Sequence, residues 1–180
     1  MIFYKRNGLL ISEETKPCLS NTWLNSLAIK KIPVRDYVLF SPSASTSVRI
    51  IPHIFHYDIV DMLYKKFYML IFGFSDIDHP HYMNISKYSS QEIDFVSIIR
   101  FAQHVYTCDS SALHISAGFN IPTTCIFSAI DQKLRVKYYK NCDFYFIGDD
   151  RLFQIQNSED EELLKLVEEI FRNYFYYTAS

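Results

Sequence analysis

Glycine is scarce in this sequence, with 4 residues among 180. A glycine-rich phosphate-binding loop is therefore absent, and tight turns must be made by Asn, Asp, Ser and Pro instead. Long apolar runs are also lacking, because the longest, residues 67–74, is far shorter than the roughly 20 residues that cross a bilayer. The N-terminus does not have the basic-then-apolar order of a signal peptide, since apolar residues 2–4 precede Lys5 and Arg6. We therefore expect a cytoplasmic protein with at most peripheral contact with the inner face of the membrane.

An excess of positive charge is missing as well. The 18 Lys and Arg residues stand against 20 Asp and Glu residues, so no global positive field attracts nucleic acid, which we do not expect as a partner. The four cysteines show no CxxC pair or other metal spacing, and we interpret them as reduced core thiols. The histidine pairs have no carboxylate or cysteine at ligand spacing, so no metal site is predicted. These residues are Cys18, Cys108, Cys125 and Cys142, with His53 and His56, and His79 and His81.

The sequence changes character near residue 36. Residues 1–36 look like an N-terminal arm, in which Asn21 is placed to cap a short helix over 23–29 that ends before Pro33. The remaining residues, 37–180, show a regular alternation of apolar and amphipathic segments. With 49% hydrophobic and 21% charged residues, a chain of this length can fill the core of one ordinary domain.

Short apolar strands alternate with helical segments from residue 37 onward. Strands are predicted over 37–40, 67–72, 83–85, 105–108, 123–127 and 144–147. Helices are predicted at four places. The first begins after Pro52, and the second begins at a capping box of Ser89 and Glu92 and runs through residue 103. The third covers 111–118, and the fourth begins at a second capping box of Ser158 and Glu161. The first of these helices has one apolar stripe of Phe55, Ile59, Met62 and Leu63. This alternation predicts an α/β fold with a mainly parallel sheet and helices on both faces.

Three loops lie at the expected carboxyl ends of strands, where ligands collect in open parallel sheets: 41–49, 73–81 and 109–111. In the third loop, Asp109, Ser110 and Ser111 join a strand to a helix whose first free N–H groups can hold a phosphate. The alternative is that Asp109 or Ser110 only caps that helix. His114, one turn later, is placed to face the same pocket, or else is an ordinary packed or surface residue. Asp76 and Asp78 in the second loop are either ligand contacts or solvated loop residues.

The segment TCDSSALHISAGFNIPTTCIF resembles the donor-domain signature of glycosyltransferase family 9, the heptosyltransferase-like enzymes, which reads roughly D-[ST]-G-x-x-H-x-[AT]-A-A-x-x-x-P followed by an apolar strand. Asp109, Ser110, His114, Ala117 and Pro122 match it in register. Upstream, FSPSASTSVRIIP resembles the family's H-P-G-A-S-x-x-K-x-W-P loop, with arginine in place of its lysine. The resemblance covers about residues 37–147.

The resemblance implies a Rossmann-like domain equivalent to the C-terminal, donor-binding half of a GT-B fold. Such an enzyme moves a sugar from a nucleotide diphosphate sugar to lipopolysaccharide or another glycan or lipid-linked acceptor, and the nucleotide sugar is its substrate, with no further cofactor. By position, Asp109, Ser110 and Ser111 would contact the diphosphate and the sugar, and His114 would assist there. Ala44, Ser45 and Arg49 would hold the phosphates; the alternative for Arg49 is a solvated loop cation.

The sequence departs from the family pattern at several points. Ser111 replaces the glycine of the signature, and Ser128 replaces the glycine after the following strand. The family's catalytic base is an aspartate in the N-terminal half, which has no counterpart here, so no catalytic residue is assigned. We therefore expect that activity needs a second polypeptide that supplies this half. The alternative is a degenerate, non-catalytic module that binds a nucleotide or another protein.

Overall fold

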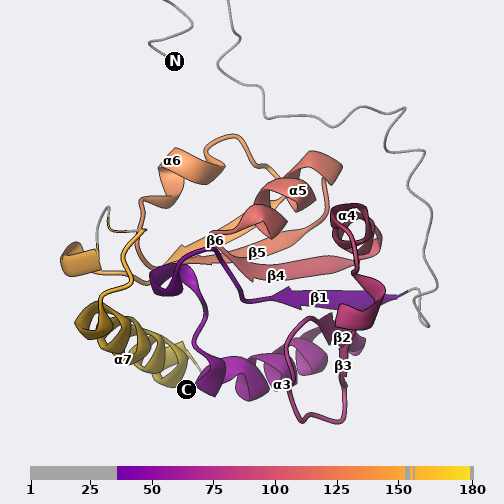
Figure 1. Ribbon diagram of the computed structural model, residues 1–180, viewed down its shortest axis with the longest axis horizontal. Coiled ribbons are helices and arrows are strands. Elements are labelled where there is room, and N and C mark those ends of the chain that lie inside the picture. Colours follow the sequence, from indigo (N-terminus) through magenta and orange to yellow (C-terminus); the bar gives the residue numbers. More distant parts are fainter. Residues whose placement is uncertain (1–35, 153–154, 156, 179–180) are drawn as a thin grey trace, which may run out of the picture.

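One parallel sheet forms the middle of the computed structural model, which describes residues 36–152, 155 and 157–178 (Figure 1). Its strand order is β3-β2-β1-β4-β5-β6, and every neighbouring pair is parallel. The arm predicted over 1–36, its short helix and Cys18 lie outside the described residues, except for Asp36. The strands are β1 (Tyr37–Ser41), β2 (Leu70–Gly73), β3 (Tyr82–Asn84), β4 (His104–Cys108), β5 (Thr123–Phe127) and β6 (Cys142–Phe146).

Helices cover both faces of the sheet, which confirms the predicted α/β fold (Figure 1). One face carries α3 (His56–Phe67) and α7 (Glu161–Thr178), and the other carries α4 (Glu92–Phe101), α5 (Ser111–Phe119) and α6 (Gln132–Val136). Because side chains alternate along a strand, β1 supplies Val38 and Phe40 to the core under α3 and α7, and Tyr37 and Leu39 to the core under α4 and α5. Burial on both sides explains why β1 is a continuous apolar run.

Four short 3-10 helices complete the described part of the chain: η1 (Ser47–Arg49), η2 (His53–Phe55), η3 (Ser86–Tyr88) and η4 (Asp150–Leu152). Pro52 precedes η2, which leads directly into α3, as the predicted helix after this proline requires. Phe55, Ile59 and Leu63 are buried on its apolar stripe, whereas Met62, expected there, is exposed. None of the helices in the described residues is long and apolar enough to cross a membrane.

The strand order reverses between β1 and β4. The chain builds β1, β2 and β3 outward in one direction, then returns beside β1 to build β4, β5 and β6 outward in the other. The loops that follow β1 and β4 therefore leave the sheet in opposite directions and open a crevice at the carboxyl ends of these two strands. Doubly wound sheets bind their ligands at this position.

The predicted strand over 67–72 is wrong at its start. Helix α3 continues through Phe67, and Tyr68 ends it in the left-handed conformation (φ 53°), with its N–H donating to the carbonyl of Tyr64 at 2.7 Å. Strand β2 begins only at Leu70. The apolar run from residue 67 joins the partly buried last residue of a helix to a buried strand, so hydrophobicity alone could not separate the two.

Neither predicted capping box forms at its predicted residues: the box of α4 lies two residues later, and Asp160 caps the start of α7. Ser89 cannot start α4, because it ends η3 and its N–H donates to the carbonyl of Ser86. Gln91 and Asp94 form the box instead, and the Asp94 carboxylate also accepts from the N–H and hydroxyl of Ser90. At α7, Asp160 rather than Ser158 accepts the first free N–H groups, those of residues 162 and 163. In each case a carboxylate nearer to the helix supplies the acceptor.

Tyr68 offers a direct test of the helix end. Its side chain is 81% exposed and its backbone is left-handed, which costs a residue with a Cβ about 1–2 kcal/mol. We expect Tyr68→Gly to raise the free energy of unfolding by about 1 kcal/mol, measured by urea denaturation.

The matched control is Tyr57→Gly. Tyr57 is also an exposed tyrosine, but it lies inside α3 in the right-handed conformation. Glycine there should lower the free energy of unfolding by about 1 kcal/mol. Equal destabilisation by both substitutions would contradict the assigned helix end.

Candidate functional site

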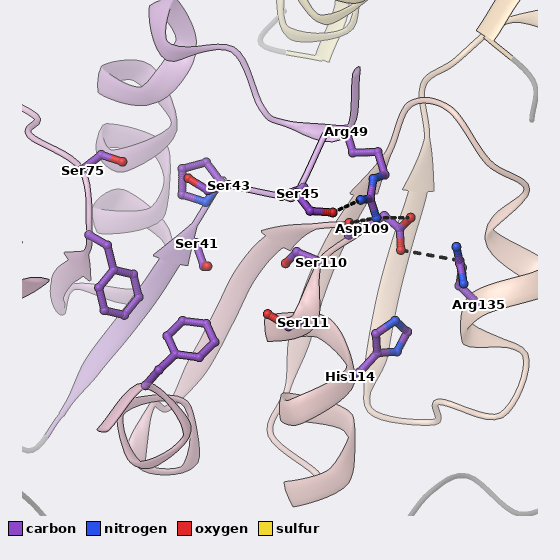
Figure 2. A pocket seen from close by; sticks show the side chains of 14 residues that line it. Ser41, Ser43, Ser45, Arg49, Ser75, Asp109, Ser110, Ser111, His114 and Arg135 are labelled. Carbon is purple, nitrogen blue, oxygen red and sulfur yellow. Dashed lines mark hydrogen bonds and ion pairs between the residues drawn. The ribbon is translucent and has the colours of Figure 1, made fainter. Parts of the chain in front are cut away.

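A cavity of about 560 Å³ opens at the carboxyl ends of β1 and β4, where the strand order reverses (Figure 2). Four segments line it: the loop after β1, the start of the loop after β2, the β4–α5 junction, and single side chains from α4 and α6. The position is the crevice that the sheet topology predicts. The lining residues are Ser41, Pro42, Ser43, Ala44, Ser45, Arg49, Phe74, Ser75, Phe95, Asp109, Ser110, Ser111, His114 and Arg135.

The cavity brings together all seven residues that the sequence predicts for the site. Ala44, Ser45 and Arg49 come from the first loop, and Asp109, Ser110, Ser111 and His114 come from the end of β4 and the start of α5. Some 60 residues of sequence separate the two groups, and they meet because β1 and β4 are neighbours in the sheet. Their roles toward a ligand remain predictions.

Arg49 is a fixed side chain, not a solvated loop cation. It is 13% exposed, and it donates from Nε to the Thr46 hydroxyl at 2.7 Å, from Nη2 to the Ser45 hydroxyl, and from Nη1 to the carbonyl of Asp109 at 3.1 Å. These bonds hold the guanidinium in one orientation at the cavity wall. A pre-oriented guanidinium loses little freedom when it meets an anion, which favours phosphate binding.

Asp109 lies between two guanidinium groups. Its carboxylate is 4% exposed, with one oxygen 3.4 Å from Nη1 of Arg49 and the other 3.8 Å from Nε of Arg135 (Figure 2). Two positive groups and one negative group leave a net charge of +1 on this wall of the cavity. The carboxylate is thus engaged in orienting the two cations, and the electrostatic preference of the wall is for a negatively charged ligand.

Arg135 is the charged residue of the cavity that sequence reasoning missed. It belongs to α6, a five-residue helix that Asp131 caps by accepting from the N–H of Lys133 at 2.9 Å. The helix is too short to give a clear periodic pattern, and Val136 is its buried residue. The cap at Asp131 is the one local signal that marks a helix start there.

The N-terminus of α5 carries no side-chain cap. Ser110 occupies the cap position, but its hydroxyl lies 3.1 Å from the Thr107 hydroxyl and makes no bond to the helix, while the Asp109 carboxylate faces the two arginines. This excludes the simple capping alternative for both residues. The first N–H groups of a nine-residue helix therefore face the cavity together with the positive end of its dipole.

His114 lies at the cavity mouth and is held by Tyr139. Its Nδ1 is 2.7 Å from the Tyr139 hydroxyl, within hydrogen-bond distance, so its Nε2 is the ring nitrogen left for a ligand. Partial burial lowers the pKa of His114; the nearby Asp109 carboxylate opposes this shift and the Arg135 guanidinium adds to it. The ring is therefore neutral near pH 7 and offers one donor or acceptor without adding charge.

Neighbouring strands hold the first loop in place. Thr107 donates its hydroxyl proton to the carbonyl of Ser41 at 2.7 Å, and the Cys108 thiol donates to the carbonyl of Pro42 at 3.2 Å. Ser128, which replaces a family glycine, donates its hydroxyl proton to the carbonyl of Val48. The loop that carries Arg49 is thus held from β4 and from the end of β5. Cys108, Cys125 and Cys142 are buried and free, in agreement with their interpretation as core thiols.

A second hollow of about 580 Å³ adjoins the first, because Phe74, Phe95 and Ser111 line both. The rings of Phe74 and Phe95 lie 5.3 Å apart at 52°. They form an apolar wall beside the polar one. Charged side chains line one side of the combined space, and aromatic rings line the other. This lining suits ligands that have both a charged part and a flat apolar part.

The remaining candidates lie away from the cavity. Asp76 accepts from the Asn84 amide at 2.6 Å, and neither Asp76 nor Asp78 lines the cavity. The rings of His53 and His56 lie 4.9 Å apart, and those of His79 and His81 lie 5.7 Å apart. Within the described ranges no group of three or more histidine, cysteine, aspartate or glutamate side chains is placed to hold a metal ion.

Three solved structures share this arrangement of strands and helices. Escherichia coli heptosyltransferase WaaC with ADP has a TM-score of 0.56 and 14% sequence identity, over 93% of this chain and 54% of that chain. The E. coli ADP-heptose LPS heptosyltransferase II has a TM-score of 0.55 and 13% identity, over 88% and 54%. WaaC with ADP-2-deoxy-2-fluoro heptose has a TM-score of 0.53 and 13% identity, over 80% and 46%.

The fold is that of about one half of a GT-B heptosyltransferase. The chain spans about half the length of these structures, so the activity of the whole enzymes is not carried over by the likeness. No protein-family model matches the sequence. A search among curated proteins gave no match either. The similarity is therefore one of fold, at an identity too low to show shared chemistry.

The charges around His114 give a testable titration. We expect its pKa, measured by NMR of the imidazole protons, to lie below the ordinary value of about 6.5. Arg135→Gln should raise this pKa because a neighbouring positive charge is removed, and Asp109→Asn should lower it because a negative charge is removed.

The native state binds fewer protons at His114 than the unfolded state does, so this group should reduce stability as the pH falls below about 6.5. His104, at the other end of β4, serves as the control and should titrate identically in both variants. A His114 pKa that is the same in all three proteins would place this ring away from the two charges.

Proposed function

We propose that this domain binds a nucleotide diphosphate sugar as the donor-binding half of a glycosyltransferase. One observation carries the proposal: the uncapped N-terminus of α5 opens into a cavity that also contains Arg49 and Arg135. Free N–H groups, a positive dipole end and two guanidiniums are the features that bind phosphate in proteins. The cavity lies at the position where doubly wound sheets hold nucleotides. Two of the structures with the same fold contain ADP or an ADP-sugar analogue.

Each wall of the cavity binds a different part of the ligand in this proposal. Arg49, with Ser45 and the backbone at Ala44, binds one phosphate from the first loop. Ser110 and Ser111, at the start of α5, bind the other phosphate through backbone N–H and hydroxyl groups. His114 donates to or accepts from the sugar at the cavity mouth. The base packs between the cavity and the adjoining aromatic wall of Phe74 and Phe95.

The donor phosphates leave with negative charge when the sugar is transferred. A guanidinium held in place before the reaction stabilises that charge without having to reorient. Arg49 satisfies this condition through its bonds to Thr46, Ser45 and Asp109. We therefore assign Arg49 to the leaving group, and we assign no catalytic base to this chain.

A second polypeptide supplies the acceptor half and the base in this proposal, and the acceptor is lipopolysaccharide or another glycan or lipid-linked molecule. Reaction then takes place in the cytoplasm or at the inner face of the membrane. The second candidate is a non-catalytic module that retains only the nucleotide pocket. The observation that favours it is Ser111, whose side chain stands at the cavity where the family has glycine.

Nucleotide binding is the direct test. Calorimetric titration of the folded chain with ADP, UDP and GDP should give saturable heat with at least one of them. Arg49→Ala should weaken that binding by about 1.5–3 kcal/mol, because a charge-assisted bond to phosphate is lost.

The matched control is Arg151→Ala. Arg151 is an exposed arginine that pairs with Asp149 and does not line the cavity, so its loss should leave the affinity unchanged. Circular dichroism checks that each variant is folded. No heat with any of the three nucleotides would refute the proposed function.

We also expect the isolated chain to transfer no sugar. Transfer requires the donor carbon and the acceptor nucleophile to be held together with a base within hydrogen-bond distance, and in a GT-B enzyme these groups come from two facing domains. Purified chain should be assayed with labelled nucleotide sugars and glycan or lipid acceptors, alone and with proteins encoded nearby. Transfer by the chain alone would contradict this expectation and would direct a search for the base to Asp76, Asp78 and Asp109.

A further inference from the structure

A separate cavity of about 180 Å³ lies at the amino ends of the strands, opposite to the candidate donor site. His104 is the first residue of β4, and Thr124 and Asp143 are the second residues of β5 and β6. All six strands are parallel, so these positions share one end of the sheet. The ends of α3 and α7 close the cavity from the face that these helices cover, with Lys66, Phe67, Tyr174 and Phe175 in its wall.

The floor of this cavity is buried, polar and uncharged. Tyr106, Thr124 and His104 are 5%, 6% and 7% exposed, and Nε2 of His104 lies 2.9 Å from the Thr124 hydroxyl. Burial lowers the pKa of His104 to about 4, so its imidazole is neutral at physiological pH. Tyr106 lines the cavity, and its hydroxyl group can both donate and accept a hydrogen bond.

Charge is confined to the rim. Lys66 and Asp143 are both exposed and have opposite signs, so they add no net charge to the cavity. A charged ligand would therefore gain little attraction, and its charge would face an uncharged floor. The charged groups of a zwitterion would lie at the rim. Its apolar part would then face the hydroxyl groups of the floor, to which it cannot form hydrogen bonds. The charge distribution thus selects a neutral ligand with several hydroxyl groups.

Aromatic rings form the outer walls. Tyr145 and Tyr174 lie 6.4 Å apart at 51°, and Phe67 and Phe175 complete the lining. The cavity has the volume that about six water molecules occupy in the liquid, which is close to the size of one sugar ring and smaller than a nucleotide. A pyranose has an apolar C–H face for aromatic packing and a rim of hydroxyl groups that both donate and accept.

We propose that this cavity is a binding site for a single neutral monosaccharide unit, either free or at the end of a glycan. The ring packs against Tyr145 and Tyr174, and its hydroxyl groups bond to Tyr106, to the His104–Thr124 pair and to Asp143 at the rim. The inference does not depend on the proposed nucleotide site, which lies at the other end of the same strands.

The test is an NMR titration of the isotopically labelled chain with D-glucose, D-galactose and D-mannose, and with L-serine as a zwitterionic probe. Binding of one sugar ring is expected in the millimolar range of Kd. At least one sugar should shift the backbone amide signals of residues 104, 106, 124, 143 and 145 and leave residues 109–111 unchanged. Tyr106→Phe removes only the hydroxyl group, and it should raise the Kd for that sugar roughly three- to tenfold.

The matched control is Tyr57→Phe, which removes the hydroxyl group of an exposed tyrosine that lines neither this cavity nor the candidate donor site, and it should leave sugar affinity unchanged. Folding of Tyr106→Phe is checked by its amide spectrum, and Thr124→Val provides a second variant that removes a floor hydroxyl. The proposal is overturned if no sugar shifts the five signals, if L-serine shifts them and the sugars do not, or if both floor variants bind sugar as the unmodified chain does. A chain that binds sugar but no nucleotide would refute the proposed function and leave this site standing.

Discussion

The reversal of strand order between β1 and β4 is the constraint on which the position of the cavity depends. A parallel sheet must be covered on both faces, and the chain meets this need by building outward from β1 twice, in opposite directions. Only at β1 and β4 do the following loops diverge. The loop with Arg49 and the junction with Asp109 are therefore brought together by topology, although neither segment is close to the other in sequence.

Within that crevice the buried carboxylate of Asp109 organises the charges. A carboxylate removed from water needs partners, and here two guanidiniums from separate segments supply them. The result is a wall in which positive charge exceeds negative charge and is held before any ligand arrives. The uncapped start of α5 adds its partial charge from the adjacent direction. Each feature alone is common in proteins, and their convergence in one cavity supports the proposed phosphate site.

The buried strands could be predicted from sequence, because apolar runs such as 37–40 and 123–127 mark strands wherever they pack. The seven proposed site residues were placed together by the family resemblance and by their position after strands, and the structure shows that they line one cavity. The end of α3 could not, since the choice between helix and strand at Phe67 depends on the left-handed turn at Tyr68. Arg135 also could not be predicted, because α6 is held by tertiary packing of Val136 more than by a local pattern. The helix starts were displaced because the Asp94 and Asp160 carboxylates accept from N–H groups at the start of each helix, a role that the sequence pattern had given to Glu92 and Ser158.

The bonds that hold the first loop from outside have a consequence for protein engineering. Its carbonyl groups at Ser41, Pro42 and Val48 accept from Thr107, Cys108 and Ser128, none of which belongs to the loop. A chimera that exchanged only residues 41–49 with those of a related domain would keep the sequence of the donor loop and lose its shape. The unit to exchange is therefore the loop together with the last residues of β4 and the residue after β5. Ligand specificity in this scaffold thus depends on segments that are discontinuous in sequence and must be exchanged together.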